Sequence, residues 1–224
     1  GGVCLSVLNP HLFWDFQTRG GLCDPSPGYR RYVAEVSRHR IHGSGMLLRV
    51  VASSMRSGLS HWWTEQDPDV VDGCMASGSI APLVYPMEVP ANSGNWYVDG
   101  SVFANTPIVK ALQEGASHIL AILLDPLAMK EIKDVEGDMK GDTRSVFSNV
   151  GFTVINYYAS AFYNNVFLGR EIESACLDFP HARIYGYIPS RDLGDWMNFT
   201  AANHDALIDL GRRDGNSPPV DLCE

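Results

Sequence analysis

The sequence predicts an α/β fold with three layers, α/β/α, around a mostly parallel central sheet. Near-continuous apolar runs at residues 46–53 and 118–124 are typical of strands that are buried on both faces. Between them, the run Trp96-Tyr97-Val98 leads through Asp99 into a glycine, and Pro107 opens a helix-type pattern. We expect the rest of the chain to be organised around this strand, turn and helix.

Length and charge limit the classes of protein that this chain represents. Its 224 residues, 45% of them hydrophobic, are enough for one compact domain, which we place at residues 1–214, with a C-terminal tail at 215–224. Lys and Arg number 17 against 26 Asp and Glu, a net charge of −9. This balance disfavours nucleic acid as a partner and provides no polybasic anchor for anionic membranes. Any contact with lipid should therefore be apolar.

The cysteine pattern signals neither a zinc site nor a disulfide framework. Five cysteines are scattered along the chain without a Cys-x-x-Cys pair, so we expect reduced thiols. No apolar run approaches the roughly 20 residues of a membrane span. The location is poorly constrained, with the cytoplasm or a peripheral membrane position favoured.

The first half of the chain contains several further elements. The predicted helices and strands are a helix over 3–16, a helix over 29–40, a core strand over 46–53, its partner over 58–64 and a helix over 69–79. The arginines at 30, 31, 38 and 40 favour a solvated helix face over contact with phosphate head groups. Trp62 and Trp63 should point to opposite faces of their strand, with one of them in the core.

The second half of the chain also contains predicted helices and strands. The expected elements are a helix from Pro107, a buried strand over 118–124, a polar surface loop over 129–142 that could act as a lid, an aromatic-rich helix over 145–167, a strand over 183–188 and a helix over 200–211. Most of the aromatic side chains in 145–167 are explained by core packing.

Asp99 is the residue of greatest chemical interest. In an α/β sheet the carboxyl ends of the strands border the crevice where ligands bind, and Asp99 ends a predicted strand. Gly100 permits a turn that a residue with a Cβ would strain. Thr106 could cap the following helix, with Pro107 at its first position. Taken alone, an Asp-Gly pair is also the ordinary signature of a surface turn.

The neighbourhood of this pair adds a family resemblance. The motif residues, in order, are Ala76-Ser77, Pro82, Tyr85, Asp99-Gly100, Asn105-x-Pro107 and Gly115-Ala116 before a buried strand. In this order and spacing they resemble the second half of the patatin-like phospholipase and acyl-hydrolase family. Ser101 departs from the family's Asp-Gly-Gly or Asp-Gly-Ala. The resemblance covers the chain from Gly1 to about Asp214 and implies a patatin-like α/β/α fold.

The resemblance implies hydrolysis of acyl esters by a serine and an aspartate, without a cofactor or metal. Asp99 matches the family's aspartate and would be the general base. The nucleophile should lie in a Gly-x-Ser-x-Gly elbow, which this sequence lacks. Gly1 and Gly2 resemble the end of that elbow, so the serine and the glycine-rich oxyanion loop would lie on a preceding N-terminal segment.

Several expectations follow from this reading. Domain 1–214 would be a catalytic domain without its nucleophile, inactive until the N-terminal segment of the same protein completes it. Its substrate would be a phospholipid or another acyl ester, reached through peripheral membrane contact. A glycine pair at the start of a chain is also a common remnant of cloning, which is the alternative interpretation of Gly1 and Gly2.

Three other interpretations remain open. His204 could act as the base of a Ser-Asp-His triad, with Asp99 orienting it, although a surface histidine is the simpler reading. Ser77 or Ser79 could be a nucleophile, but neither has an elbow or a flanking base. The chain could also be a non-catalytic binding module. His39 and His42 are weak evidence for a metal.

Overall fold

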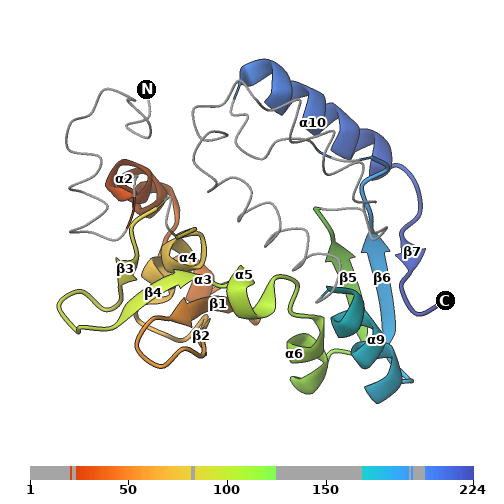
Figure 1. The fold of residues 1–224 in the computed structure, drawn as a ribbon, viewed down its shortest axis with the longest axis horizontal. Helices are drawn as coiled ribbons and strands as arrows, with labels where there is room; N and C mark the ends of the chain where they lie inside the picture. Colours follow the sequence, from red (N-terminus) through yellow and green to blue (C-terminus); the bar gives the residue numbers. More distant parts are fainter. Residues whose placement is uncertain (1–20, 22–23, 82–83, 125–167, 192, 194–199) are drawn as a thin grey trace, which may run out of the picture. The chain divides into compact units, whose positions relative to one another are not determined.

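The computed structural model describes residues 21, 24–81, 84–124, 168–191, 193 and 200–224. The expected helix at 3–16, the loop at 129–142, the helix at 145–167, and Gly1 and Gly2 lie outside this set. The chain divides into two compact units, Gly1–Ala104 and Asn105–Glu224. Figure 1 shows the elements of both units.

Unit 1 contains a four-stranded sheet in the order β2-β1-β4-β3. Its strands are β1 (Arg49–Ser54), β2 (Ser60–Thr64), β3 (Met87–Glu88) and β4 (Trp96–Asp99). Every pair is antiparallel, including the central pair of β1 and β4, in which Ala52 lies opposite Asp99. The mostly parallel three-layer architecture expected from the sequence is therefore wrong.

The core of unit 1 forms around β1. Val51, Ala52 and Ser53 are consecutive and all buried, so both faces of β1 are covered, as the apolar run predicts. Trp63 of β2 is buried against Tyr97 with their rings edge to face, whereas Trp62 is only half-buried. This confirms that one of the two tryptophans lies in the core.

Met46 and Leu47 differ from the prediction, because β1 begins only at Arg49. Both side chains are exposed instead of belonging to a buried strand.

Among the described residues of unit 1, three helices come before β3 in the chain. The predicted helix over 29–40 is two helices, α2 (Ser26–Glu35) and α3 (Arg38–His42), because Val36 adopts an extended conformation between them. The predicted small-residue helix is α4 (Val70–Ser77), where a Cβ on Gly73 would meet the ring of Trp63. The Tyr29 hydroxyl of α2 donates a 2.6 Å hydrogen bond to Asp72 of α4, and this bond, together with burial, raises the pKa of Tyr29 to about 12.

Unit 2 contains a mixed sheet in the order β5-β6-β7. The strands β5 (His118–Ile122) and β6 (Arg183–Tyr187) are parallel, and β7 (Val220–Asp221) is antiparallel to β6. The helices α6 (Ile108–Gln113) and α9 (Leu168–Asp178) supply the rest of its core. Ala121 and Leu123 face that core, while Leu120, Ile122 and Leu124 are exposed, so the expectation of a strand buried on both faces is wrong here.

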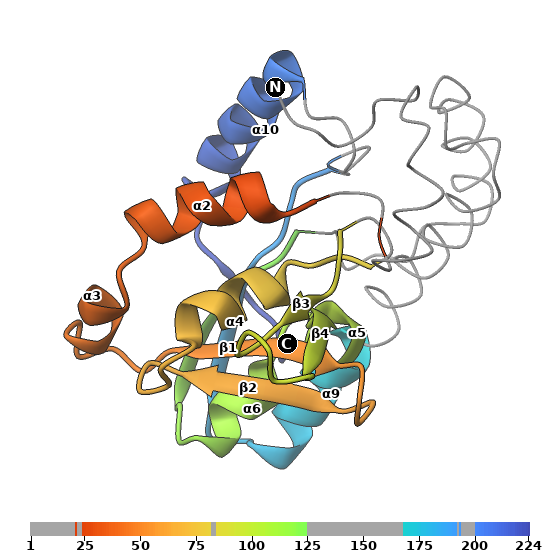
Figure 2. The same cartoon turned by 90° about the vertical axis from the view of Figure 1, so that its left-hand side faces the viewer.

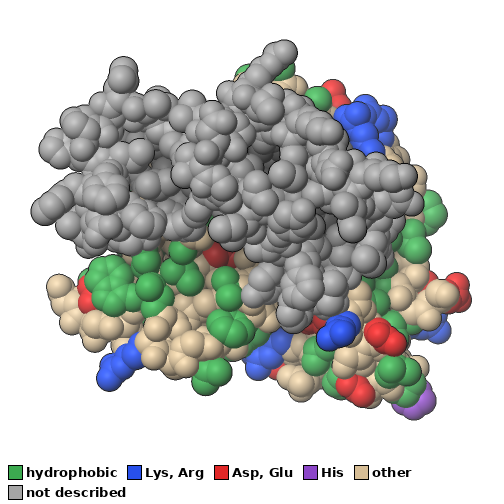
Figure 3. Space-filling model, viewed as in Figure 1, with side chains coloured by type: hydrophobic (Ala, Val, Ile, Leu, Met, Phe, Trp, Pro, Cys, Tyr) green, Lys and Arg blue, Asp and Glu red, His purple; other side chains and the backbone are tan. Residues whose placement is uncertain are grey.

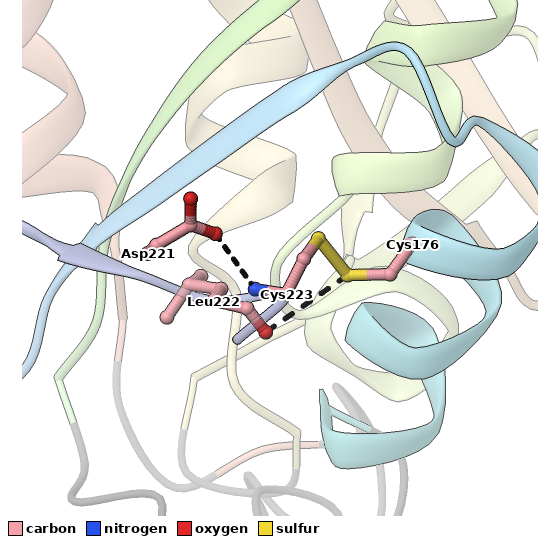
Figure 4. The surroundings of a disulfide bond; sticks show 4 residues. All are labelled: Cys176, Asp221, Leu222 and Cys223. Carbon is pink, nitrogen blue, oxygen red and sulfur yellow. Dashed lines mark hydrogen bonds between the residues drawn. A yellow bond between two sulfur atoms is a disulfide. The ribbon is translucent and has the colours of Figure 1, made fainter.

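The C-terminal residues are structured rather than a plain tail. Helix α10 (Ala201–Asp214) is capped by Thr200, whose side chain accepts a hydrogen bond from the backbone N–H of Asn203. Beyond it, β7 leads to Cys223, which forms a disulfide with Cys176 of α9, the Cα atoms lying 5.6 Å apart (Figure 4). The expectation of reduced thiols is wrong for these two cysteines, because β7 returns the chain end to α9. Among the helices of the described ranges, none is both long and apolar enough to cross a bilayer.

Candidate active site

Asp99 is the last residue of β4 and is half-buried. Directly after Gly100 the chain forms a short helix, α5 (Ser101–Ala104), which the sequence analysis did not predict. Because β1 runs antiparallel to β4, the aspartate does not lie at an edge shared by the carboxyl ends of parallel strands. The strand topology therefore does not place a ligand crevice at Asp99.

The backbone around Asp99 is fixed by hydrogen bonds from two directions. The Asp99 N–H donates to the carbonyl of Ser79 (2.9 Å), and the Asp99 carbonyl accepts from the Ser53 hydroxyl (2.8 Å). The Gly100 N–H donates to the carbonyl of Ser77 (3.4 Å). The end of α4 and strand β1 thus hold the turn between them.

The turn at Gly100 has no room for a side chain. A Cβ at this position would collide with the backbone carbonyl of Val51. Gly100 is not among the residues with positive φ, so crowding by β1, rather than an unusual conformation, explains the glycine. A side chain here would push β4 away from β1.

The Asp99 carboxylate contacts the first turn of α5. Its Oδ1 accepts a 2.7 Å hydrogen bond from the Ser101 N–H, as a capping aspartate does. Its Oδ2 has no hydrogen-bond partner within the part of the chain that the structure describes. The bond from Ser101 therefore orients the carboxylate through one of its two oxygens.

The serines that contact the Asp99–Gly100 backbone do not bond to the Asp99 carboxylate through their hydroxyls in the described residues. Ser79 is 1% exposed and its hydroxyl donates to the carbonyl of Met75. Ser53 donates to the Asp99 backbone, and Ser77 contributes its carbonyl. No serine hydroxyl of the described ranges is hydrogen-bonded to the Asp99 carboxylate.

The remaining candidate residues belong to other segments of the chain. Gly1 and Gly2 are outside the described residues. His204 is exposed on α10, in unit 2. Thr106 does not cap α6, because Pro107 occupies the N-cap position and no side-chain bond is made there. Within the described ranges, no three His, Cys, Asp or Glu side chains gather as metal ligands would.

No family model matches this chain, and no curated protein matches it. The resemblance to patatin-like acyl hydrolases therefore depends on the motif residues around Asp99, and the function that it implies is a proposal.

Sequence reasoning missed Ser53 as a residue that supports the candidate base. A signal was present, because Ser53 is a polar residue inside the apolar run 46–53, and a buried hydroxyl requires a hydrogen-bond partner. Ser79 supports Asp99 through its backbone carbonyl, which accepts a hydrogen bond from the Asp99 N–H. Any residue type has such a carbonyl, so the sequence contains no signal for this contact.

Proposed function

We propose that this protein is an acyl-ester hydrolase of the phospholipase, lysophospholipase or esterase type, in which Asp99 is the general base. The observation that carries the proposal is the Asp99 carboxylate itself, held at the end of β4 with Oδ1 bonded to Ser101 and Oδ2 unpartnered among the described residues. A fixed carboxylate with one available oxygen suits proton transfer from a hydroxyl.

The nucleophile in this proposal is a serine on a segment that precedes Gly1, as the resemblance implies. Asp99 would accept the serine proton while the serine oxygen attacks the ester carbonyl. Asp99 then gives this proton to the departing alcohol and is ionised again. In the second half of the reaction it takes a proton from the attacking water and returns it to the serine oxygen as the carboxylic acid is released. Neither a cofactor nor a metal enters these steps.

The experiment treats the complete protein with an alkyl fluorophosphonate, which reacts covalently with activated serines, and measures hydrolysis of a nitrophenyl ester and of phosphatidylcholine. We expect ester hydrolysis, one labelled serine, and loss of labelling in Asp99→Asn. Absence of hydrolysis, or equal labelling in Asp99→Asn, contradicts the proposal. Asp67→Asn is the matched control, because the Asp67 carboxylate also caps a turn in unit 1, accepting from the Thr64 N–H and hydroxyl.

A non-catalytic binding module is the second candidate. It is favoured by the hydrogen bond from the Ser101 N–H to the Asp99 carboxylate. This bond gives the carboxylate a structural role, the capping of α5, that requires no catalysis. This alternative predicts no serine labelling in the wild type and a loss of stability in Asp99→Ala. A Ser-Asp-His triad predicts in addition that His204→Ala abolishes labelling.

A further inference from the structure

Met46 and Leu47 form an exposed apolar pair just before β1. They are adjacent in sequence and are 71% and 75% exposed. Single exposed hydrophobic side chains mixed with charged ones, as on the face shown in Figure 3, are normal and need no ligand. Two neighbouring large side chains that are each more than two-thirds exposed leave more apolar surface in water.

The local structure holds this pair outward. Ile41 and Leu48, on either side, both pack against the core of unit 1. Between them the Ser44 hydroxyl donates to the carbonyl of Ile41 and accepts from the Met46 N–H. The loop is thus fixed to the end of α3, and Met46 and Leu47 project from an anchored turn.

Basic residues are concentrated in the same segment of the chain. Residues 36–47 contain Arg38, His39, Arg40 and His42 and no acid, in a chain whose net charge is −9. Arg31 and Arg49 pair with Glu35 and Glu65, whereas Arg38 and Arg40 have no acidic partner among the described residues. Figure 2 shows α3 at the margin of unit 1, with the loop after it leading into β1.

We propose that residues 38–47 dock onto a membrane surface that carries anionic lipids. Arg38 and Arg40 contact lipid phosphates, and Met46 and Leu47 enter the boundary between head groups and acyl chains. Charge complementarity selects this occupant, because the cluster is basic in an acidic chain, and the projecting apolar pair matches the hydrocarbon beneath the phosphates. A polyanion such as nucleic acid would leave Met46 and Leu47 without a partner.

This inference rests on the proposed function, since an enzyme that hydrolyses acyl lipids has to reach substrate held in a bilayer. It differs from the expectation, drawn from the net charge of −9, that any lipid contact would be apolar. Arg38 and Arg40 are exposed, as expected for a solvated helix face, and are therefore accessible to lipid phosphates.

The test is sedimentation of the complete protein with phosphatidylcholine vesicles that contain or lack phosphatidylserine, at low and high salt. We expect binding only with phosphatidylserine and weaker binding at high salt. Arg38→Gln/Arg40→Gln should weaken binding roughly 20- to 30-fold, about five-fold for each arginine. Met46→Ser/Leu47→Ser should weaken it by at least about ten-fold.

Matched controls change the same residue types elsewhere. Arg212→Gln/Arg213→Gln alters two exposed arginines of α10, and Met55→Ser/Leu59→Ser alters two exposed hydrophobic residues at the β1–β2 turn. Both should bind vesicles as the wild type does. Because all of these positions are exposed, thermal unfolding of the four variants should match that of the wild type.

The proposal is overturned if the wild type does not bind phosphatidylserine vesicles, if either 38–47 variant binds like the wild type, or if the controls lose as much binding. Binding to a soluble polyanion or an acidic protein in place of vesicles also overturns it. Asp99→Asn measured in parallel should bind vesicles fully. Sedimentation measures vesicle binding and does not depend on ester hydrolysis. Failure of the docking proposal can therefore be distinguished from failure of the hydrolase proposal.

Discussion

The hydroxyl of Ser53 donates a 2.8 Å hydrogen bond to the backbone carbonyl of Asp99, joining β1 to the residue at which β4 ends. Ser53 is 4% exposed, so the bond is shielded from water. A buried side chain of one strand therefore fixes the backbone that carries the candidate base.

Replacing Ser53 with alanine should lower the free energy of unfolding by about 1 kcal/mol, because the Asp99 carbonyl loses a buried partner. Urea unfolding measures this change. If Asp99 is the base, Ser53→Ala should also slow ester hydrolysis. Ser37→Ala is the control, since Ser37 is exposed and makes no side-chain cap. Equal stability of the two variants would show that the Ser53 bond contributes nothing.

Gly100→Ala and Gly28→Ala should change stability in opposite directions. The new Cβ at position 100 meets the Val51 carbonyl, and we expect a loss of about 1–3 kcal/mol. Gly28 lies in α2 with open space around it, so alanine there should stabilise the protein by about 0.5–1 kcal/mol. Thermal unfolding of both variants decides the matter. A stable Gly100→Ala variant would mean that β4 does not pack this closely on β1.

The disulfide between Cys176 and Cys223 should stabilise unit 2. It links residues 47 apart in sequence, and the loop-closure model predicts at most about 4 kcal/mol for such a bridge. Cys176→Ser/Cys223→Ser should therefore unfold at lower urea concentration than Cys74→Ser, which removes a cysteine that is free in the structure. Peptide mapping without reductant should recover the two cysteines in one linked species. Recovery of separate, alkylated peptides would contradict the bridge.

Glu171 gives a prediction about pH. Burial raises the pKa of its carboxyl, although the backbone N–H groups of Val109 and Ile108 act in the opposite direction. A folded pKa above the unfolded value means that ionisation favours unfolding. The cost is absent below the unfolded pKa of about 4.3 and grows as pH rises through the folded pKa.

Glu171→Gln removes this titration, and its side-chain oxygen still accepts from the Val109 N–H. Its stability relative to the wild type should therefore increase between about pH 4 and pH 7. Glu173→Gln is the matched control, because Glu173 lies on the exposed side of α9. Urea titrations across this range provide the measurement, and a flat difference for Glu171→Gln would contradict the prediction.

The sequence predicted the individual strands and helices better than their arrangement. Local patterns indicate how a segment is buried, and they were enough to predict β1, β2 and α4. These patterns are the apolar run before Ser54, the adjacent tryptophans and the small residues of α4. Strand direction is not encoded in such patterns, because both parallel and antiparallel strands are buried this way. One usable signal was the short link between Ser54 and Ser60, which permits only an antiparallel pair.

The candidate site was predicted in part. Asp99 and Gly100 were chosen from a strand, a turn and a family motif, whereas their partners come from segments distant in sequence. Ser53 and Ser79 meet Asp99 only after β1, α4 and β4 have packed, so local patterns could not pair them. The disulfide was missed for the same reason, since cysteine spacing does not reveal which chain segments fold together.

The central claim is that the Asp99 carboxylate takes a proton during ester hydrolysis. The most direct measurement is the hydrolysis rate of Asp99→Asn in the complete protein, beside Asp67→Asn. Asparagine can still accept the hydrogen bond from the Ser101 N–H, so the cap persists while the base is lost. The account predicts a rate at least about 10²-fold lower for Asp99→Asn, with unchanged thermal unfolding and a normal rate for Asp67→Asn. A wild-type rate for Asp99→Asn would reduce Asp99 to a helix cap and contradict the account.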